Sequence, residues 1–95
     1  MAAEQSEWEQ FCETASAVMR DALQKRITLE EATEFFENNK SISSVDVRRY
    51  TMYMMWEIDG SRESYLELLK LFESRSSEAE LARYIGNRGH HWPWN

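Results

Sequence analysis

The chain has 95 residues, a formal net charge of −6, 42% hydrophobic residues and a single cysteine. This length predicts one domain, residues 1–95, with one modest core, and a lone cysteine excludes an internal disulfide. The negative balance disfavours direct binding of nucleic acid or of an anionic membrane, because both repel negative charge.

The chain also lacks the sequence features of export and membrane insertion. Its first residues contain neither the basic region nor the apolar run of a signal peptide. No apolar stretch approaches the length of a membrane span. We therefore expect a soluble protein of a reducing compartment, most simply the cytoplasm.

The negative charge is unevenly distributed along the chain. Residues 1–37 contain nine acidic and three basic side chains, whereas residues 38–95 contain eight of each. Such an acidic region attracts a basic protein surface, including one that normally holds nucleic acid. The alternative is that acidic helices only keep a small protein soluble.

A first helix is predicted from Ser6 to about Lys25. Ser6 and Glu9 have the spacing of a capping box, which satisfies backbone amides at a helix start. Apolar residues then recur at the spacing of one helical face. These residues are Trp8, Phe11, Cys12, Ala15, Val18, Met19 and Ala22. A thiol on this face is expected to be buried, reduced and inert.

A second helix is predicted to begin at Thr28, which has the capping-box spacing with Glu31. Asparagines and a lysine at 38–40 should end it. One side of this helix carries three acidic residues at i, i+4 and i+7. They are Glu30, Glu34 and Glu37.

The most apolar segment, Tyr50–Ile58, has seven apolar or aromatic residues among nine. We predict that it belongs to a third helix, which Ser43 and Asp46 begin and which Gly60 follows as the residue after the helix end. Its two opposite apolar stripes are Val47, Tyr50, Met54 and Ile58, and Val45, Met52 and Trp56. A helix that is apolar on two sides must be covered on more than one side, by other helices or by a partner.

A β-strand is the competing interpretation of this segment, because residues 45–53 include β-branched and aromatic residues. We reject the strand because the residues after Gly60 have a helical pattern, which leaves no second strand for pairing.

Two further helices complete the predicted body. Ser61 is expected to open the fourth helix, and Ser77 with Glu80 the fifth, which Gly86 should end. The inward residues of the fifth helix are expected to be Leu81, Ala82 and Ile85. The predicted fold is therefore all-α: a single small domain with a compact bundle of four to five short helices in residues 6–86. Residues 1–5 are expected to be flexible.

The C-terminal tail, residues 87–95, has a different composition. Pro93 biases Trp92 toward an extended conformation. Trp92 and Trp94 are costly to leave in water. We expect one or both to fold back onto the helices; the alternative is that they contact a partner.

No catalytic, cofactor-binding or metal-binding motif is recognisable. The histidines at 90–91 are adjacent in sequence, unlike a pair one helical turn apart that could share a metal. The pairs Glu9/Glu13 and Glu30/Glu34 lack the Glu-x-x-His motif of carboxylate metal sites in helical bundles. They are typical of solvated helix faces. We expect no enzymatic activity, no metal and no cofactor.

Two adjacent arginines, Arg48 and Arg49, lie near the start of the predicted third helix, where the helix dipole disfavours cations. One explanation is that they pair with the acidic first or second helix. The other is that they border an exposed stripe of Val45, Met52 and Trp56 and help to orient a partner.

Three classes of function fit these features. We favour a non-enzymatic protein-binding domain, such as a small acidic inhibitor or immunity-type factor that masks a basic site on a target protein. The second class is a self-associating structural or assembly subunit, a homo-oligomer formed through the Met and aromatic helix face. The third is a nucleic-acid-associated regulator that uses the Arg48/Arg49 and Arg83/Arg88 clusters, which the net charge disfavours. The candidate partner-binding residues are Glu9, Glu13, Glu30, Glu34, Glu37, Val45, Arg48, Arg49, Met52, Trp56, Trp92 and Trp94.

Overall fold

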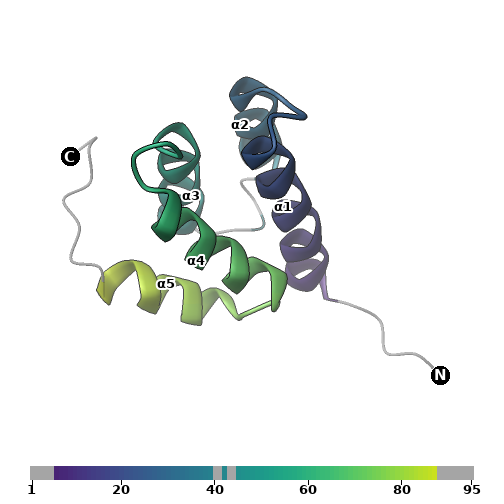
Figure 1. Ribbon diagram of the computed structural model, residues 1–95. Coiled ribbons are helices and arrows are strands. Elements are labelled where there is room, and N and C mark those ends of the chain that lie inside the picture. The colour runs from purple at the N-terminus through teal and green to yellow at the C-terminus, as the bar shows by residue number, and fades with distance from the viewer. Residues whose placement is uncertain (1–5, 40–41, 43–44, 88–95) are drawn as a thin grey trace.

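The structure is a computed structural model that describes residues 6–39, 42 and 45–87. Within these residues the chain forms five α-helices and no strand (Figure 1). The helices are α1 (Glu7–Leu23), α2 (Leu29–Asn38), α3 (Val45–Trp56), α4 (Arg62–Glu73) and α5 (Glu78–Asn87). The predicted all-α helical bundle is confirmed.

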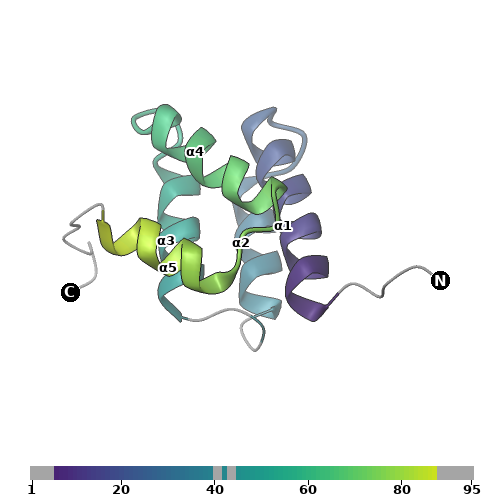
Figure 2. The same cartoon turned by 90° about the horizontal axis from the view of Figure 1, so that it is seen from below.

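The helices are arranged in two layers. In one layer α1, α2 and α3 stand side by side, with α2 in the middle (Figures 1 and 2). In the other layer α4 packs against both α1 and α3, and α5 packs against α3. Because α4 and α5 lie across one face of the first layer, no described helix covers its opposite face.

Capping boxes fix the starts of α1 and α2, as the sequence predicted. The Glu9 amide donates to Ser6 Oγ over 3.1 Å, and the Glu9 carboxylate accepts from the Ser6 amide. Thr28 and Glu31 make the same two hydrogen bonds at α2. These bonds satisfy amides that have no partner within the helix.

The starts of α4 and α5 differ from each other. The Glu80 amide donates to Ser77 Oγ over 3.2 Å, which is one of the two hydrogen bonds of the predicted capping box. Ser61 occupies the N-cap position of α4, but its side chain makes no capping hydrogen bond. Its φ of −132° and ψ of 37° lie outside the extended conformation of Ser6 and Thr28.

Two predictions about glycine at the helix ends were wrong. Gly60 does not directly follow α3, because residues 57–60 form a turn in which the Gly60 amide donates to the Glu57 carbonyl. Gly86 does not end α5, which continues to Asn87. The left-handed residues after α1 and α4 are instead Lys25, with a φ of 61°, and Arg75, with a φ of 55°.

The core lies between the two layers, and α3 supplies much of it. The buried residues of α3 are Val47, Tyr50, Thr51, Met54 and Met55. The Thr51 hydroxyl is satisfied within the helix, because it donates to the Val47 carbonyl over 2.7 Å. These positions follow one helical face, so the opposite face of α3 points away from the core.

The fifth helix differs from its prediction at one position. Leu81 and Ile85 are buried, whereas Ala82 is exposed rather than inward-facing. Because alanine buries little apolar area, its burial contributes little to the choice of helix face.

Candidate functional site

The side of α3 that faces away from the core carries Trp56, the last residue of the helix. Its exposed fraction is 51%. Among the described residues it is the one large hydrophobic residue that is exposed. Met52 and Tyr53, four and three residues earlier, are half-buried beside it. The second apolar stripe predicted for this helix is therefore only partly covered at Met52 and Trp56.

The exposed indole is held in place from the neighbouring helix. Trp56 Nε1 donates a hydrogen bond of 3.0 Å to Thr33 Oγ1 on α2. This bond satisfies the polar end of the ring and leaves its apolar surface facing water. A tryptophan that is restrained before binding loses less side-chain entropy when a partner covers it.

Trp56 forms one wall of a hollow between α2 and α3. The hollow is open to solvent and has a volume of about 610 Å³. We call it the α2–α3 hollow; its lining residues are Thr33, Glu37, Arg49, Met52, Tyr53 and Trp56. The combination of thioether, aromatic rings and a few polar groups is typical of surfaces that bind other molecules.

An acidic surface adjoins the hollow. Glu30, Glu34 and Glu37 are all exposed on α2, and we call these three residues the acidic face of α2. Glu37 itself lines the hollow. Among the residues that the structure describes, no cation lies within ion-pair distance of these carboxylates.

The two adjacent arginines of α3 have different surroundings. Arg49 is exposed and lines the α2–α3 hollow. Arg48 is half-buried, and its Nε atom has no hydrogen-bond partner in the described part of the chain. Neither arginine forms an ion pair with a described residue of α1 or α2. The position of Arg49 favours the interpretation that it borders the exposed stripe.

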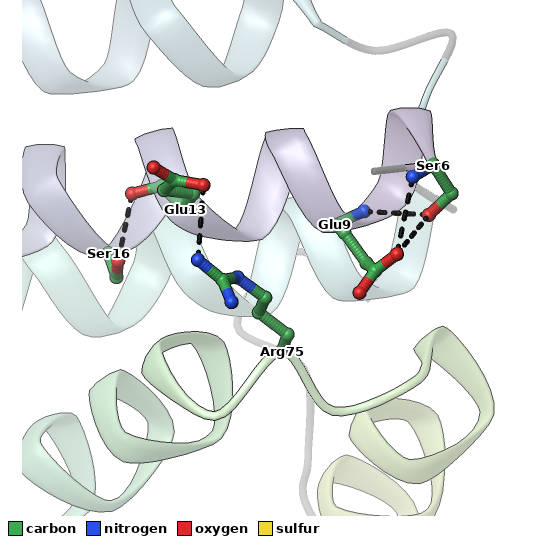
Figure 3. Close-up of polar contacts among 5 residues, drawn as sticks. All are labelled: Ser6, Glu9, Glu13, Ser16 and Arg75. Carbon is green, nitrogen blue, oxygen red and sulfur yellow. Dashed lines mark hydrogen bonds and ion pairs between the residues drawn. The ribbon is translucent and has the colours of Figure 1, made fainter. Parts of the chain in front are cut away.

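Two acidic residues predicted to bind a partner have local roles on α1 (Figure 3). Glu9 closes the capping box with Ser6. Glu13 Oε2 accepts a 3.2 Å bond from Arg75 Nη2, in the connection between α4 and α5. The structure therefore separates Glu9 and Glu13 from the α2–α3 hollow, whereas it brings Glu37, Arg49, Met52 and Trp56 together.

The remaining predicted site residues lie outside the described residues. These are the side chain of Val45, within α3, and Trp92 and Trp94 in the tail. The predictions for Ser43 and for the histidines at 90–91 fall outside them as well.

Two residues of the hollow, Tyr53 and Thr33, were not singled out from the sequence. The one that binds Trp56 is Thr33. It lies four residues before Glu37 and three after Glu30, so it shares a side of α2 with both. This spacing was available from the sequence. Its hydrogen bond to Trp56 was not, because that contact joins residues 23 positions apart.

The lone cysteine is buried in the core. Cys12 is 0% exposed and makes no disulfide. Burial raises the pKa of its thiol to about 11, and the nearby Arg75 charge opposes this shift only in part. Such a thiol holds its proton at neutral pH, so it is a poor nucleophile there. Within the described ranges, no three His, Cys, Asp or Glu residues gather as metal ligands would.

None of the described helices is both long and apolar enough to cross a bilayer. No protein-family model, curated protein or solved structure matches the chain.

Proposed function

We propose that this chain is a non-enzymatic protein-binding domain, an acidic inhibitor or immunity-type factor that masks a basic site on a target protein. The observation that carries the proposal is Trp56, which is half exposed and held by Thr33 in an open hollow. Tryptophan is enriched among the residues that dominate binding energy at protein interfaces. The proposal places the protein in the cytoplasm, where a lone buried thiol stays reduced.

The charge near the hollow supports a basic target. The acidic face of α2 adds three exposed carboxylates, of which Glu37 lines the hollow. Complementary charge accelerates the encounter of two proteins and disfavours partners of the wrong sign. An acidic partner or a nucleic acid would be repelled at this face.

Affinity capture tests the proposal. The tagged protein is used as bait in an extract of its host, beside a variant in which Glu30, Glu34 and Glu37 are replaced by lysine. We expect the unmodified bait to retain one dominant protein and the charge-reversed bait to lose it. The control is Glu63→Lys, on α4, which does not line the hollow. Unchanged capture by the charge-reversed bait would reject a basic target.

Self-association is the second candidate function. It is favoured by the same exposed Trp56 and by Met52 beside it, because an apolar face can cover itself in a two-fold dimer. Light scattering would then give twice the mass of one chain. Trp56→Glu should restore the single mass without a loss of helicity. A single mass for the unmodified protein would exclude this candidate.

A further inference from the structure

We propose that the α2–α3 hollow receives one basic amphipathic helix of the partner protein. This inference rests on the proposed function, because it specifies which part of a target the domain binds. It assigns apolar contacts of that helix to Met52 and Trp56, and its lysine or arginine side chains to the acidic face of α2.

The walls of the hollow favour a helix over an extended strand. Both walls are α-helices, whose central amides and carbonyls are hydrogen-bonded within the helix. An added strand binds through main-chain hydrogen bonds to a free sheet edge, and these walls offer none. A helix binds through side chains alone, and helices in grooves use apolar residues at positions one turn apart.

The part of α3 that lines the hollow spans about two helical turns. Arg49 and Trp56 are seven residues apart on the wall, which corresponds to about 10 Å at the rise of an α-helix. Within this length, Met52 and Trp56 are separated by one turn. Two apolar residues at i and i+4 of an incoming helix match this spacing. The flexible Met52 thioether accommodates several side-chain shapes, whereas Trp56 is restrained by Thr33.

The charges define how the incoming helix is oriented. Glu30, Glu34 and Glu37 are exposed on the α2 side, and Arg49 stands on the α3 side. Basic residues of the partner should therefore face α2. Arg49 would repel a helix that is basic all round. The occupant is thus a helix with one apolar stripe and a basic side next to it.

A displayed library of random 16-residue peptides provides an unbiased probe. The library is selected on the full chain and, in parallel, on the Trp56→Ser variant. We expect sequences enriched only on the unmodified chain to carry two apolar residues three or four apart with lysine or arginine beside them. Enrichment of neutral or acidic sequences, or no enrichment beyond the Trp56→Ser control, would overturn the proposal.

The affinities of the selected peptides for variants of this chain identify the residues that are responsible for binding. Trp56→Ser should weaken binding at least about 30-fold, the loss expected for a dominant interface residue. Glu34→Lys with Glu37→Lys should weaken it at least about tenfold, because attraction becomes repulsion. Glu63→Lys, whose charge change per site is the same, should leave binding within about twofold. Equal losses for Glu63→Lys and for the variant with Glu34→Lys and Glu37→Lys would show non-specific attraction and would overturn the proposal.

The affinities can be compared only if each variant retains the helical content of the parent, which circular dichroism measures. Thr33→Val is a second variant that leaves Trp56 in place and removes only its hydrogen bond. It should weaken peptide binding by about three- to tenfold through loss of restraint. Unaltered binding by both Trp56→Ser and Thr33→Val would place the peptide elsewhere and overturn the proposal.

The same measurements separate this inference from the proposed function. If affinity capture yields a partner whose binding needs the acidic face but survives Trp56→Ser, the function stands and the helix-binding mode is wrong. If the peptides bind as expected but capture yields no partner, the protein-masking function is wrong. A doubled mass that Trp56→Glu abolishes would identify a second copy as the occupant and overturn the proposal.

Discussion

The aromatic rings of the core show how strongly single residues determine stability. Phe36 is 1% exposed, and its ring meets those of Phe35 and Phe11 edge-on, at centroid distances of 5.0 and 6.0 Å. Phe35 stacks on Phe11 at 5.7 Å but is only half-buried. Substitution of the two adjacent phenylalanines therefore compares a buried ring with a half-buried one.

We predict that Phe36→Ala lowers the free energy of unfolding by about 3–5 kcal/mol, because it removes a buried ring and leaves a cavity. Phe35→Ala should cost clearly less, since part of its ring already faces water. Urea unfolding of both variants measures the difference. A cost below about 0.5 kcal/mol for Phe36→Ala, the range of surface substitutions, would show that this side of α2 is not core.

The buried thiol makes stability depend on alkaline pH. Burial raises the pKa of Cys12 from 9.0 to about 11 in the folded protein. Between these values the unfolded chain loses the thiol proton while the folded chain keeps it, so the free energy of unfolding falls as pH rises. Burial also raises the pKa of Tyr65 above its ordinary value of 10, which adds to the fall.

We predict that the free energy of unfolding, measured with urea, decreases between pH 9 and about pH 11, by at most about 1.4 kcal/mol per pH unit for each group. Well below pH 9, where the thiol is protonated in both states, it contributes no pH dependence. Cys12→Ala should show a shallower decrease than the parent, because only the contribution of Tyr65 remains. If the free energy of unfolding changed with pH in the same way for the parent and for Cys12→Ala, the contribution assigned to the Cys12 thiol would be wrong.

At the scale of elements, α1 and α4 end in the same way without glycine. After α1 the Arg26 amide donates to the Asp21 carbonyl, and after α4 the Ser76 amide donates to the Leu71 carbonyl. Both are the long hydrogen bond of a Schellman motif, in which the preceding residue is left-handed. The residues in that position, Lys25 and Arg75, carry a Cβ that disfavours it.

We predict that Lys25→Gly raises the free energy of unfolding by about 0.5–1 kcal/mol, because the relief of backbone strain outweighs the greater freedom of glycine in the unfolded chain. Arg75→Gly should gain less, since it also loses the ion pair with Glu13. Thermal unfolding of the two variants compares them directly. A destabilised Lys25→Gly protein would contradict the strain assigned to that position.

How far the sequence predicts each element depends on the range of the interactions that form it. The capping boxes of α1 and α2 and the apolar face of α1 involve neighbours three or four residues apart, so they were predictable. The ends at Lys25 and Arg75 were not, because glycine is the usual left-handed residue. The bond between Thr33 and Trp56 depends on how α2 meets α3, which no local pattern specifies.

At the scale of the whole molecule, a hydrogen bond and an ion pair join α1 to the connection between α4 and α5. Trp8 Nε1 donates to the Ser76 carbonyl over 2.8 Å, and Arg75 pairs with Glu13. Arg20 of α1 also pairs with Glu73, the last residue of α4. In these contacts Glu13, an acidic residue of α1, pairs with a cation of the same chain. The acidic face of α2 keeps its charge at the surface, beside the exposed indole.

Photo-crosslinking tests the role of the α2–α3 hollow most directly. A photoreactive phenylalanine replaces Arg49 in the hollow or, as a control, Lys70, an exposed cation on α4. In host cells the probe at Arg49 should link to one partner, and excess unmodified protein but not the Trp56→Ser variant should compete. The probe at Lys70 should not give this product. The same products from both positions, or a product made only of two copies of this chain, would contradict a partner site in the hollow.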